Sequence, residues 1–378
     1  MNKFEFYLKY IFRTVDGNYY NWRFYLPLLG VAFGVISVTL TFAIMQGMEE
    51  EVFNKLESIN YSAAINDDNF IKPQNKDFTY VIEKKAIINS LDEYRVINIR
   101  AIEAFDSFKE NSIKNFLIES VSSTDTKQVI IGRGLASKLG VSVNDVINLI
   151  SPTDVNLFTG IPASVKVKIS GIFNLQLLNY DDQYIFTNLT VGELLFKSAK
   201  KQIYSNLKPE EIKLENPEIR NITSWRDRHF DFISAMRLEK LAFSSFGFLI
   251  ILLSSFSSFS IMCITVVRRV AEIGILRTLG FTPVMIANIY FLQSILIGLV
   301  GGLIGAIVSK VLIRLDNSYH LITNLFTSEI MFHFNLSIEN QQIFMIFSIG
   351  LIIMLIAGIY PSIYASKIPI LKSLNYSK

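Results

Sequence analysis

Four long stretches of the chain contain no charged side chain, and polar segments separate them. The charge-free stretches cover residues 24–46, 241–267, 284–309 and 342–361. A helix needs about 20 apolar residues to cross the hydrocarbon core of a bilayer. Each stretch therefore predicts a transmembrane helix, and the long polar segment 47–240 predicts a domain outside the membrane.

The first stretch admits two interpretations, a cleaved signal peptide or a retained anchor. Signal peptides have an apolar region of about 7–15 residues and a small-residue cleavage site. The stretch 24–46 is longer, and no such site precedes Glu49. The pattern therefore favours a retained first transmembrane helix.

Basic residues in the short flanks predict the orientation, because cytoplasmic flanks are enriched in Lys and Arg. Such residues occur in the N-terminal segment 1–23, the loop 268–283 and the tail 362–378, whereas 317–338 has none. The connection 310–341 is thus predicted outside, and both termini inside a plasma (inner) membrane. The aromatic and basic residues of 1–23 are typical of an interfacial helix.

The segment 47–240 mixes two hydrophobic periods. Residues 164–173 alternate apolar and polar side chains, which predicts a half-buried strand. Residues 129–150 predict a strand, a short helix over 134–139, a turn and a second strand, with glycines as punctuation. A helix is expected to open at Thr190. These elements predict an α+β domain.

Composition argues against an enzyme and against nucleic acid. The chain is 51% hydrophobic and 18% charged, its net charge is only +3, and no dense basic tract appears. There is no G-x-S-x-G nucleophile elbow and no Walker loop, and the three histidines are isolated. We therefore expect no catalytic residue, no metal site and no cofactor in this chain. The "GRG" at 132–134 and the "YDD" at 180–182 are interpreted as turns, the latter solvated.

Small residues recur four apart inside two of the predicted spans. The positions are Gly30 and Gly34 in the first span, and Gly298, Gly301, Gly302 and Gly305 in the third. This spacing lets helix backbones approach closely, within one chain or against a second copy.

The loop after the second span, "RRVAEIGILRTLGF", concentrates charge between two apolar runs. A single helix over 268–281 would place Arg268, Arg269 and Glu272 on one arc, with Arg268 and Glu272 spaced to pair. The other sides of that helix are apolar, which favours burial against a partner. The alternative is a loop whose arginines only set the topology.

The order of these features resembles the FtsX-like permeases of ABC transporters, and within them the lipoprotein-releasing LolC/LolE permeases. The resemblance rests on six segments, which follow one another in the family's order. They are 43–52, 129–152, 169–186, 224–240, 290–309 and 360–374. The implied fold is an integral membrane α-helical protein with four transmembrane helices and a large periplasmic α+β domain inserted between helices 1 and 2.

The resemblance also implies partners. They are an ATP-binding subunit that holds ATP and Mg, a second permease (identical or related), a LolA-like periplasmic carrier, lipoprotein cargo and membrane lipid. Contact with the ATP-binding subunit is expected at Arg268, Arg269, Glu272, Leu276, Arg277 and Gly280. A carrier-binding hook is expected over 153–165, with its tip at Phe158, Gly160, Ile161 and Pro162. The alternative for the tip is an ordinary hairpin turn.

Two other functions remain open at this stage. A related MacB/FtsX-type mechanotransmission permease would use its outer domain to drive efflux or to activate a cell-wall hydrolase. A membrane receptor or sensor without transport is the second, although the tail 362–378 is too short to hold a signalling domain.

Overall fold

The protein is described here by a computed structural model. It describes Tyr7, Tyr10 and the ranges 22–66, 72–73, 77–90, 93–121, 126–155, 160–215, 217, 219, 221–320 and 334–369. The chain divides into two compact units. We call Met1–Glu49, Ala235–Ser328 and His333–Lys378 the helical unit. We call Glu50–Ser234, with Glu329–Phe332, the sheet domain.

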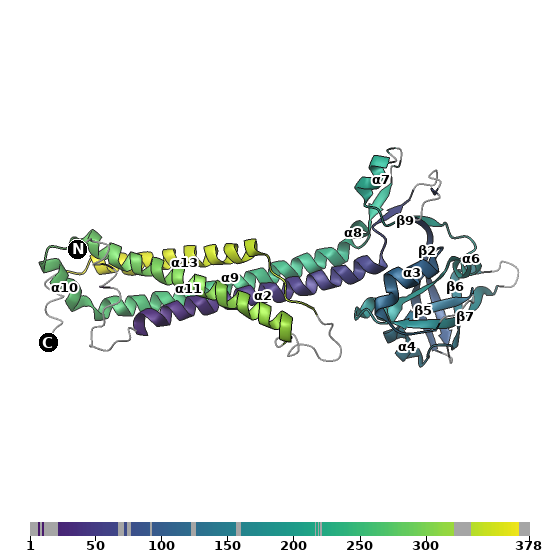
Figure 1. The fold of residues 1–378 in the computed structure, drawn as a ribbon, viewed down its shortest axis with the longest axis horizontal. Coiled ribbons are helices and arrows are strands. Elements are labelled where there is room, and N and C mark those ends of the chain that lie inside the picture. Colours follow the sequence, from purple (N-terminus) through teal and green to yellow (C-terminus); the bar gives the residue numbers. More distant parts are fainter. Residues whose placement is uncertain are drawn as a thin grey trace. The chain divides into compact units, whose positions relative to one another are not determined.

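Four long apolar helices occur where the four spans were predicted, and each is long and apolar enough to cross a membrane (Figure 1). They are α2 (Trp22–Ile59), α9 (Phe230–Arg268), α11 (Pro283–Tyr319) and α13 (Asn340–Ser366), with the short α10 (Val270–Thr278) between α9 and α11. The helices run past the predicted ends of the spans, and the last ten residues of α2 belong to the sheet domain. Charged residues such as Glu and Lys are good helix formers, so the end of an apolar run does not end a helix.

Glycines bring α11 close to two neighbours. Gly301 and Gly305 face α2, where an added Cβ atom would lie 2.8 Å from the carbonyl oxygens of Leu28 and Ala32 respectively. On another face of α11, Gly298 and Gly302 lie against α13. There an added Cβ would meet the side chains of Leu351, Met354 and Phe347. These four glycines therefore pack within the chain.

A second close approach joins α2 and α9. An added Cβ at Gly34 would lie 2.5 Å from the Ser254 hydroxyl, whereas one at Gly30 would lie 3.7 Å from the Ser258 hydroxyl, an ordinary contact. Ser258 Oγ also donates a hydrogen bond to the carbonyl of Pro27, at 3.1 Å. This bond adds a polar contact between α2 and α9 at the same place.

The sheet domain is built on one mixed sheet. Its strands are β1 (Ala63–Ile65), β2 (Phe78–Ser90), β3 (Glu93–Ile102), β4 (Leu117–Ser120), β5 (Gln128–Gly132), β6 (Val146–Val155), β7 (Pro162–Phe173), β8 (Tyr184–Asn188), β9 (Gln202–Ser205) and β10 (Ile222–Ser224). The order is β10-β1-β9-β2-β3-β8-β5-β7-β4, and β6 pairs with both β2 and β7. The short helices are α3 (Phe105–Phe108), α4 (Arg133–Leu139), α5 (Leu178–Gln183), α6 (Leu189–Leu195), α7 (Pro209–Glu215) and α8 (Trp225–Arg228).

Apolar clusters cover both faces of this sheet. In β5, Val129 and Ile131 belong to one cluster and Ile130 to another. Successive strand residues point to opposite faces. A strand buried on both faces reads as a continuous apolar run, which explains why "QVII" carries no alternation.

The predicted strand and helix around the glycines are confirmed. In β7, Val165, Val167 and Ile169 are buried, in the expected alternation. Helix α4 ends at Gly140, whose φ of +63° is the left-handed conformation that glycine adopts without strain.

One turn interpretation is wrong. Asp181 of "YDD" is buried, and its carboxylate accepts hydrogen bonds from the backbone N–H groups of Leu175, at 2.8 Å, and Leu177, at 2.9 Å. Gly132 of "GRG" lies directly beneath it, since an added Cβ would meet the Asp181 carbonyl at 2.2 Å. Asp181 thus organises the loop 175–177, and Gly132 lets the end of β5 approach the Asp181 backbone.

Candidate functional site

The segment 268–281 is not the single helix that was predicted. Arg268 is the last residue of α9, and Arg269, with φ −97° and ψ 16°, precedes the separate helix α10. The break places Arg268 and Glu272 on different helices, so they do not have the i, i+4 relation within one helix. Gly280, with φ +97°, follows α10, and Thr282 caps the start of α11.

Arg269 points into the helical unit. It is 3% exposed. Its Nη1 donates to the carbonyl oxygen of Tyr10 at 3.3 Å, and its guanidinium lies 5.1 Å from the Tyr10 ring centre. Burial raises the pKa of Tyr10 to about 12, and the negative charge of Glu272 acts in the same direction. This arginine therefore fastens the N-terminal segment to the α9–α10 junction.

One side of α10 packs on the chain itself. Val270 and Ile273 are buried in a cluster with Tyr290 of α11, and the half-buried Leu276 packs against that cluster. Arg277 is also half-buried, and its Nη1 donates to the carbonyl oxygen of Ser366, at the end of α13, at 3.1 Å.

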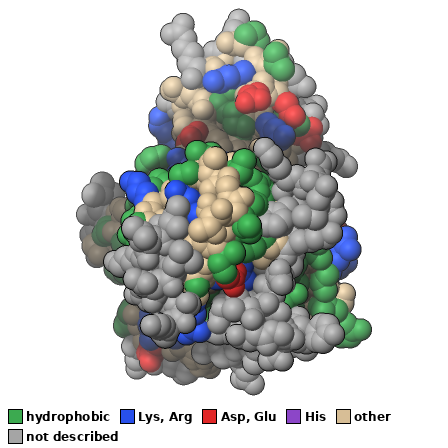
Figure 2. Space-filling model, turned by 90° about the vertical axis from the view of Figure 1, so that its left-hand side faces the viewer, with side chains coloured by type: hydrophobic (Ala, Val, Ile, Leu, Met, Phe, Trp, Pro, Cys, Tyr) green, Lys and Arg blue, Asp and Glu red, His purple; other side chains and the backbone are tan. Residues whose placement is uncertain are grey.

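The other side of α10 is exposed and apolar. Ile275 is 53% exposed, Leu279 is 72% exposed, and they lie four residues apart. Val284, at the start of α11, is also exposed, at 66%. Sequence reasoning missed these residues because it had no way to fix the rotational phase of a helix that is apolar on most sides. Figure 2 views this end of the helical unit and shows hydrophobic side chains beside Lys and Arg.

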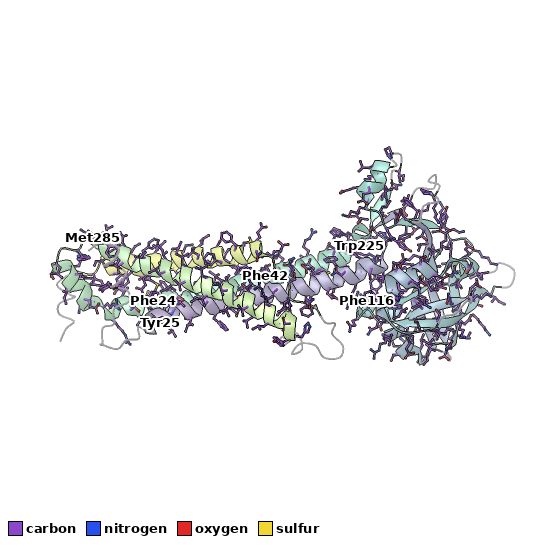
Figure 3. All side chains as sticks on the ribbon, in the orientation of Figure 1. Phe24, Tyr25, Phe42, Phe116, Trp225 and Met285 are labelled. Atoms are coloured by element: carbon purple, nitrogen blue, oxygen red, sulfur yellow. The ribbon has the colours of Figure 1, made fainter. Side chains whose placement is uncertain are left out.

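The start of α2, α10 and the start of α11 share one end of the helical unit. Figure 3 shows Phe24 and Tyr25 at that end, together with Met285, whereas Phe42 lies further along α2. The start of α2 and the 268–283 loop, which carries three of the predicted cytoplasmic arginines, are therefore at the same end.

The hook segment forms an antiparallel hairpin. Strands β6 and β7 pair as far as Val155↔Pro162. Phe158 lies outside the described residues. Gly160 has φ +65°, Ile161 is 63% exposed, and Pro162 is exposed as the first residue of β7.

Asp154 fixes the end of β6 that leads into the turn of this hairpin. Its carboxylate accepts hydrogen bonds from the backbone N–H of Ser198 at 3.2 Å, from the Ser198 hydroxyl and from the Thr153 hydroxyl at 3.1 Å. The Ser198 hydroxyl is the main reason that the pKa of Asp154 lies below its ordinary value. The end of β6 beside the turn is therefore tied to the segment after α6.

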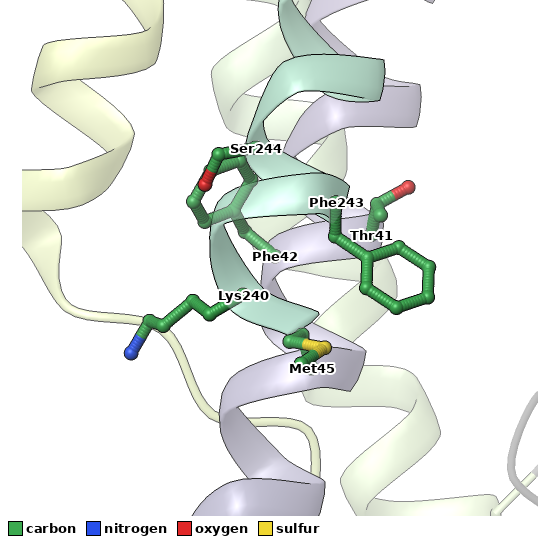
Figure 4. Close-up of a pocket in the computed structure, with 6 residues that line it drawn as sticks. All are labelled: Thr41, Phe42, Met45, Lys240, Phe243 and Ser244. Carbon is green, nitrogen blue, oxygen red and sulfur yellow. The ribbon is translucent and has the colours of Figure 1, made fainter. Parts of the chain in front are cut away.

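A small pocket lies between α2 and α9 (Figure 4). Thr41, Phe42 and Met45 of α2 line it together with Lys240, Phe243 and Ser244 of α9. Its volume is about 10 Å³, which is about the room for one water molecule and far too little for an acyl chain. Lys240, which lines the pocket, also forms an ion pair with Glu49 (Nζ–Oε2 2.7 Å). This ion pair links α2 and α9 beside the pocket.

The described residues contain no group of three or more His, Cys, Asp or Glu side chains that could hold a metal ion. Within the same residues, the polar clusters around Asp181 and Asp154 bind backbone or hydroxyl groups of the chain. The two clusters therefore stabilise the local fold.

Two family profiles match consecutive parts of the chain. The profile of the FtsX-like permease C-terminal family matches residues 244–370, and that of the MacB-like periplasmic core domain matches residues 26–213. The first covers nearly all of α9 to α13, and the second runs from α2 into α7.

Two LolC relatives match along almost the whole length, and a LolE relative matches three quarters of it. The chain is 28% identical to the lipoprotein-releasing system transmembrane protein LolC of Buchnera aphidicola subsp. Schizaphis graminum, over 95% of both chains. It is 25% identical to LolC of Haemophilus influenzae, over 93% of both. It is 23% identical to LolE of Haemophilus influenzae, over 75% of this chain and 76% of that one.

Proposed function

This chain belongs to the FtsX-like permeases of ABC transporters, and on that premise we propose that it extracts lipoproteins from the inner membrane and passes them to a LolA-like periplasmic carrier. A separate ATP-binding subunit would bind ATP and Mg and supply the energy. A second permease, identical or related, would complete the membrane part. No cofactor is assigned to this chain.

The observation that carries the proposal is the length of the match to LolC. The match to the Buchnera protein covers 95% of the chain, so it includes most of the helical unit and most of the sheet domain. The β6–β7 hairpin, with its exposed Ile161 and Pro162, is a suitable projecting element for a carrier. Exposed apolar tips that are held on rigid strands bind a groove at little entropic cost.

The exposed side of α10 is the proposed docking site for the ATP-binding subunit. Ile275 and Leu279 lie near the predicted cytoplasmic arginines, at the end where the partner would sit. Burial of each of these two side chains would contribute roughly 1.5–3 kcal/mol to the free energy of binding. Arg269, Leu276 and Arg277 would then act indirectly, since they hold α10 against α11, α13 and the N-terminal segment.

The test is reconstitution of the full chain with its ATP-binding subunit and second permease in proteoliposomes that carry a fluorescent triacylated lipoprotein. We expect the lipoprotein to leave the membrane only when ATP and a LolA-like carrier are both present. Release without ATP, or no release with all components present and ATP being hydrolysed, would contradict the proposal.

The docking site is tested by the variant Ile275→Asp/Leu279→Asp. We expect it to insert normally but to lose co-purification with the ATP-binding subunit. Leu214→Asp is the matched control, because Leu214 is 84% exposed on α7 in the sheet domain. Equal co-purification of both variants would rule out α10 as the docking site.

One observation favours a second candidate, a MacB/FtsX-type permease that drives efflux or activates a cell-wall hydrolase. It is the match of the MacB-like periplasmic core domain to residues 26–213. The same reconstitution separates the two functions. A mechanotransmission permease would hydrolyse ATP and move its outer domain while the labelled lipoprotein stays in the membrane.

A further inference from the structure

The last turns of α2, residues 50–59, end on a buried arginine of the sheet domain. Arg100 of β3 donates from Nη1 to the carbonyl oxygen of Ile59, the last residue of α2, at 2.9 Å. The final carbonyls of a helix have no partner within the helix and carry its negative partial charge. A guanidinium at this point therefore satisfies a carbonyl and complements the helix dipole at once.

The guanidinium of Arg100 is itself fixed in place. The residue is 1% exposed, and its Nη2 donates to Glu83 Oε1 of β2 at 3.0 Å. The other oxygen of Glu83 accepts from the Tyr204 hydroxyl at 3.2 Å. The guanidinium also lies 5.7 Å from the ring centre of Tyr184 on β8. Strands β2, β3, β8 and β9 thus all contribute to holding one cation against the end of α2.

Two further cations hold the same stretch of chain. Lys55 of α2 is 7% exposed, and its Nζ donates to Gln176 Oε1 at 3.2 Å, in the loop that Asp181 organises. Arg228 of α8 donates from Nη2 to the carbonyl oxygen of Tyr61 at 3.3 Å, and its guanidinium lies 4.6 Å from the Tyr204 ring centre. Residues 55–61 are therefore attached to the sheet domain at three separate points.

Stability alone does not account for this arrangement. Desolvation of a buried ion pair offsets much of its attraction, and apolar residues of similar volume often replace such a pair without loss of stability. The guanidinium does offer something that an apolar side chain cannot, a directed bond that fixes the helix end relative to the strands. The pair is suited to setting position and direction.

We propose that Arg100, held by Glu83, is a positioning residue that clamps the end of α2 to the sheet, so that movement of α2 in the ATP cycle moves the sheet domain. This inference rests on the proposed function, because it assumes an ATP-driven cycle. The clamp is defined as Arg100, Glu83 and the Ile59 carbonyl.

The test uses the full chain in the reconstituted complex, with the double variant Arg100→Met/Glu83→Gln. It removes both charges together and keeps a partner for Tyr204, so the domain keeps its fold. The matched control is Arg95→Met/Glu93→Gln, an exposed pair on the same strand with an N–O distance of 3.4 Å. ATP hydrolysis, lipoprotein release and amide hydrogen exchange over residues 51–61 are measured in each.

We expect the clamp variant to hydrolyse ATP within about twofold of the wild type while release per ATP falls at least tenfold. Amides over 51–61 should exchange faster than in the control, which should match the wild type. Unchanged release per ATP, or a fall that only follows the loss of ATP hydrolysis, would overturn the proposal.

Failure of the proposed function gives a different result. In that case the wild type itself releases no lipoprotein, and the clamp is judged from hydrogen exchange. Unaltered exchange over 51–61 in the Arg100→Met/Glu83→Gln variant then overturns the clamp independently.

Discussion

The helical unit and the sheet domain differ in their internal packing. In the helical unit α11 approaches α2 and α13 closely at a row of glycines, such as Gly305 against the carbonyl of Ala32. In the sheet domain the core consists of Ile, Val, Leu and Phe side chains on both faces of the sheet. Lipid tails are as apolar as leucine, so helices in a bilayer gain from close packing, whereas a domain in water gains from burial itself.

The two parts also place their buried arginines differently. Arg100 lies deep in the sheet domain and is paired with Glu83, whereas Arg269 lies at the end of α9 and binds a carbonyl and a ring of Tyr10. A charge within the hydrocarbon is expensive, so a membrane unit keeps its cations near helix ends. The sheet domain can surround a cation with several polar groups, and here Arg100 binds the carbonyl at the end of α2.

The largest expected effect is a loss of unfolding free energy in the sheet domain when the Arg100–Glu83 pair is broken. Replacement of Arg100 alone, as Arg100→Met, leaves the Glu83 carboxylate without its partner. Removal of one partner of a buried pair destabilises by about 3–5 kcal/mol. Urea unfolding of the full chain in detergent, followed by Trp225 fluorescence in a Trp22→Phe background, should show this loss. A loss no larger than that of Arg95→Met would contradict it.

The next effect tests the helical unit through its glycines. In Gly305→Ala, the added Cβ would meet both the Ala32 carbonyl and Val35 Cβ at 2.8 Å, so α2 and α11 must separate. Overpacking of this kind costs about 1–3 kcal/mol. Unfolding in SDS–detergent mixtures should show it. Gly30→Ala is the control, because its Cβ would find only Ser258 Oγ, at 3.7 Å. Equal stability of the two variants would show that the glycines do not set the packing.

The sequence was most informative about the helical unit. Absence of charge over 24–46 and the three later stretches identified every one of the four apolar helices, because a span has to be continuous and apolar. The spacing of Gly301 and Gly305 predicted close packing. It could not identify α2 as the neighbour, because the tertiary arrangement decides which helix lies against these glycines. The helix ends were missed because Glu and Lys continue a helix as well as apolar residues do.

The sequence was least informative about buried polar groups. Arg100 occupies an ordinary strand position in "RVINIRAI", and nothing local indicates that Ile59 and Glu83 converge on it. Asp181 looked like part of a solvated turn for the same reason. The outward side of α10 was also hidden, because Ile275 and Leu276 are equivalent in composition and only the fold decides which of them is exposed.

The smallest effect concerns the pH dependence of the sheet domain. Burial of Glu83 favours its neutral form, but the neighbouring Arg100 guanidinium outweighs this and lowers the carboxyl pKa below its ordinary 4.5. A carboxylate with a depressed folded-state pKa contributes stability above the unfolded-state value. That contribution is lost as the pH falls through the folded-state pKa, at about 1.4 kcal/mol per unit of depression.

The wild type should therefore have a larger unfolding free energy than Glu83→Gln at pH 7. The gap between the two free energies should narrow below pH 4.5. Glu93→Gln, on the exposed part of β3, should show a much smaller gap. A gap for Glu83→Gln that stays constant from pH 7 down into the acid range would mean that Arg100 holds α2 without the Glu83 charge.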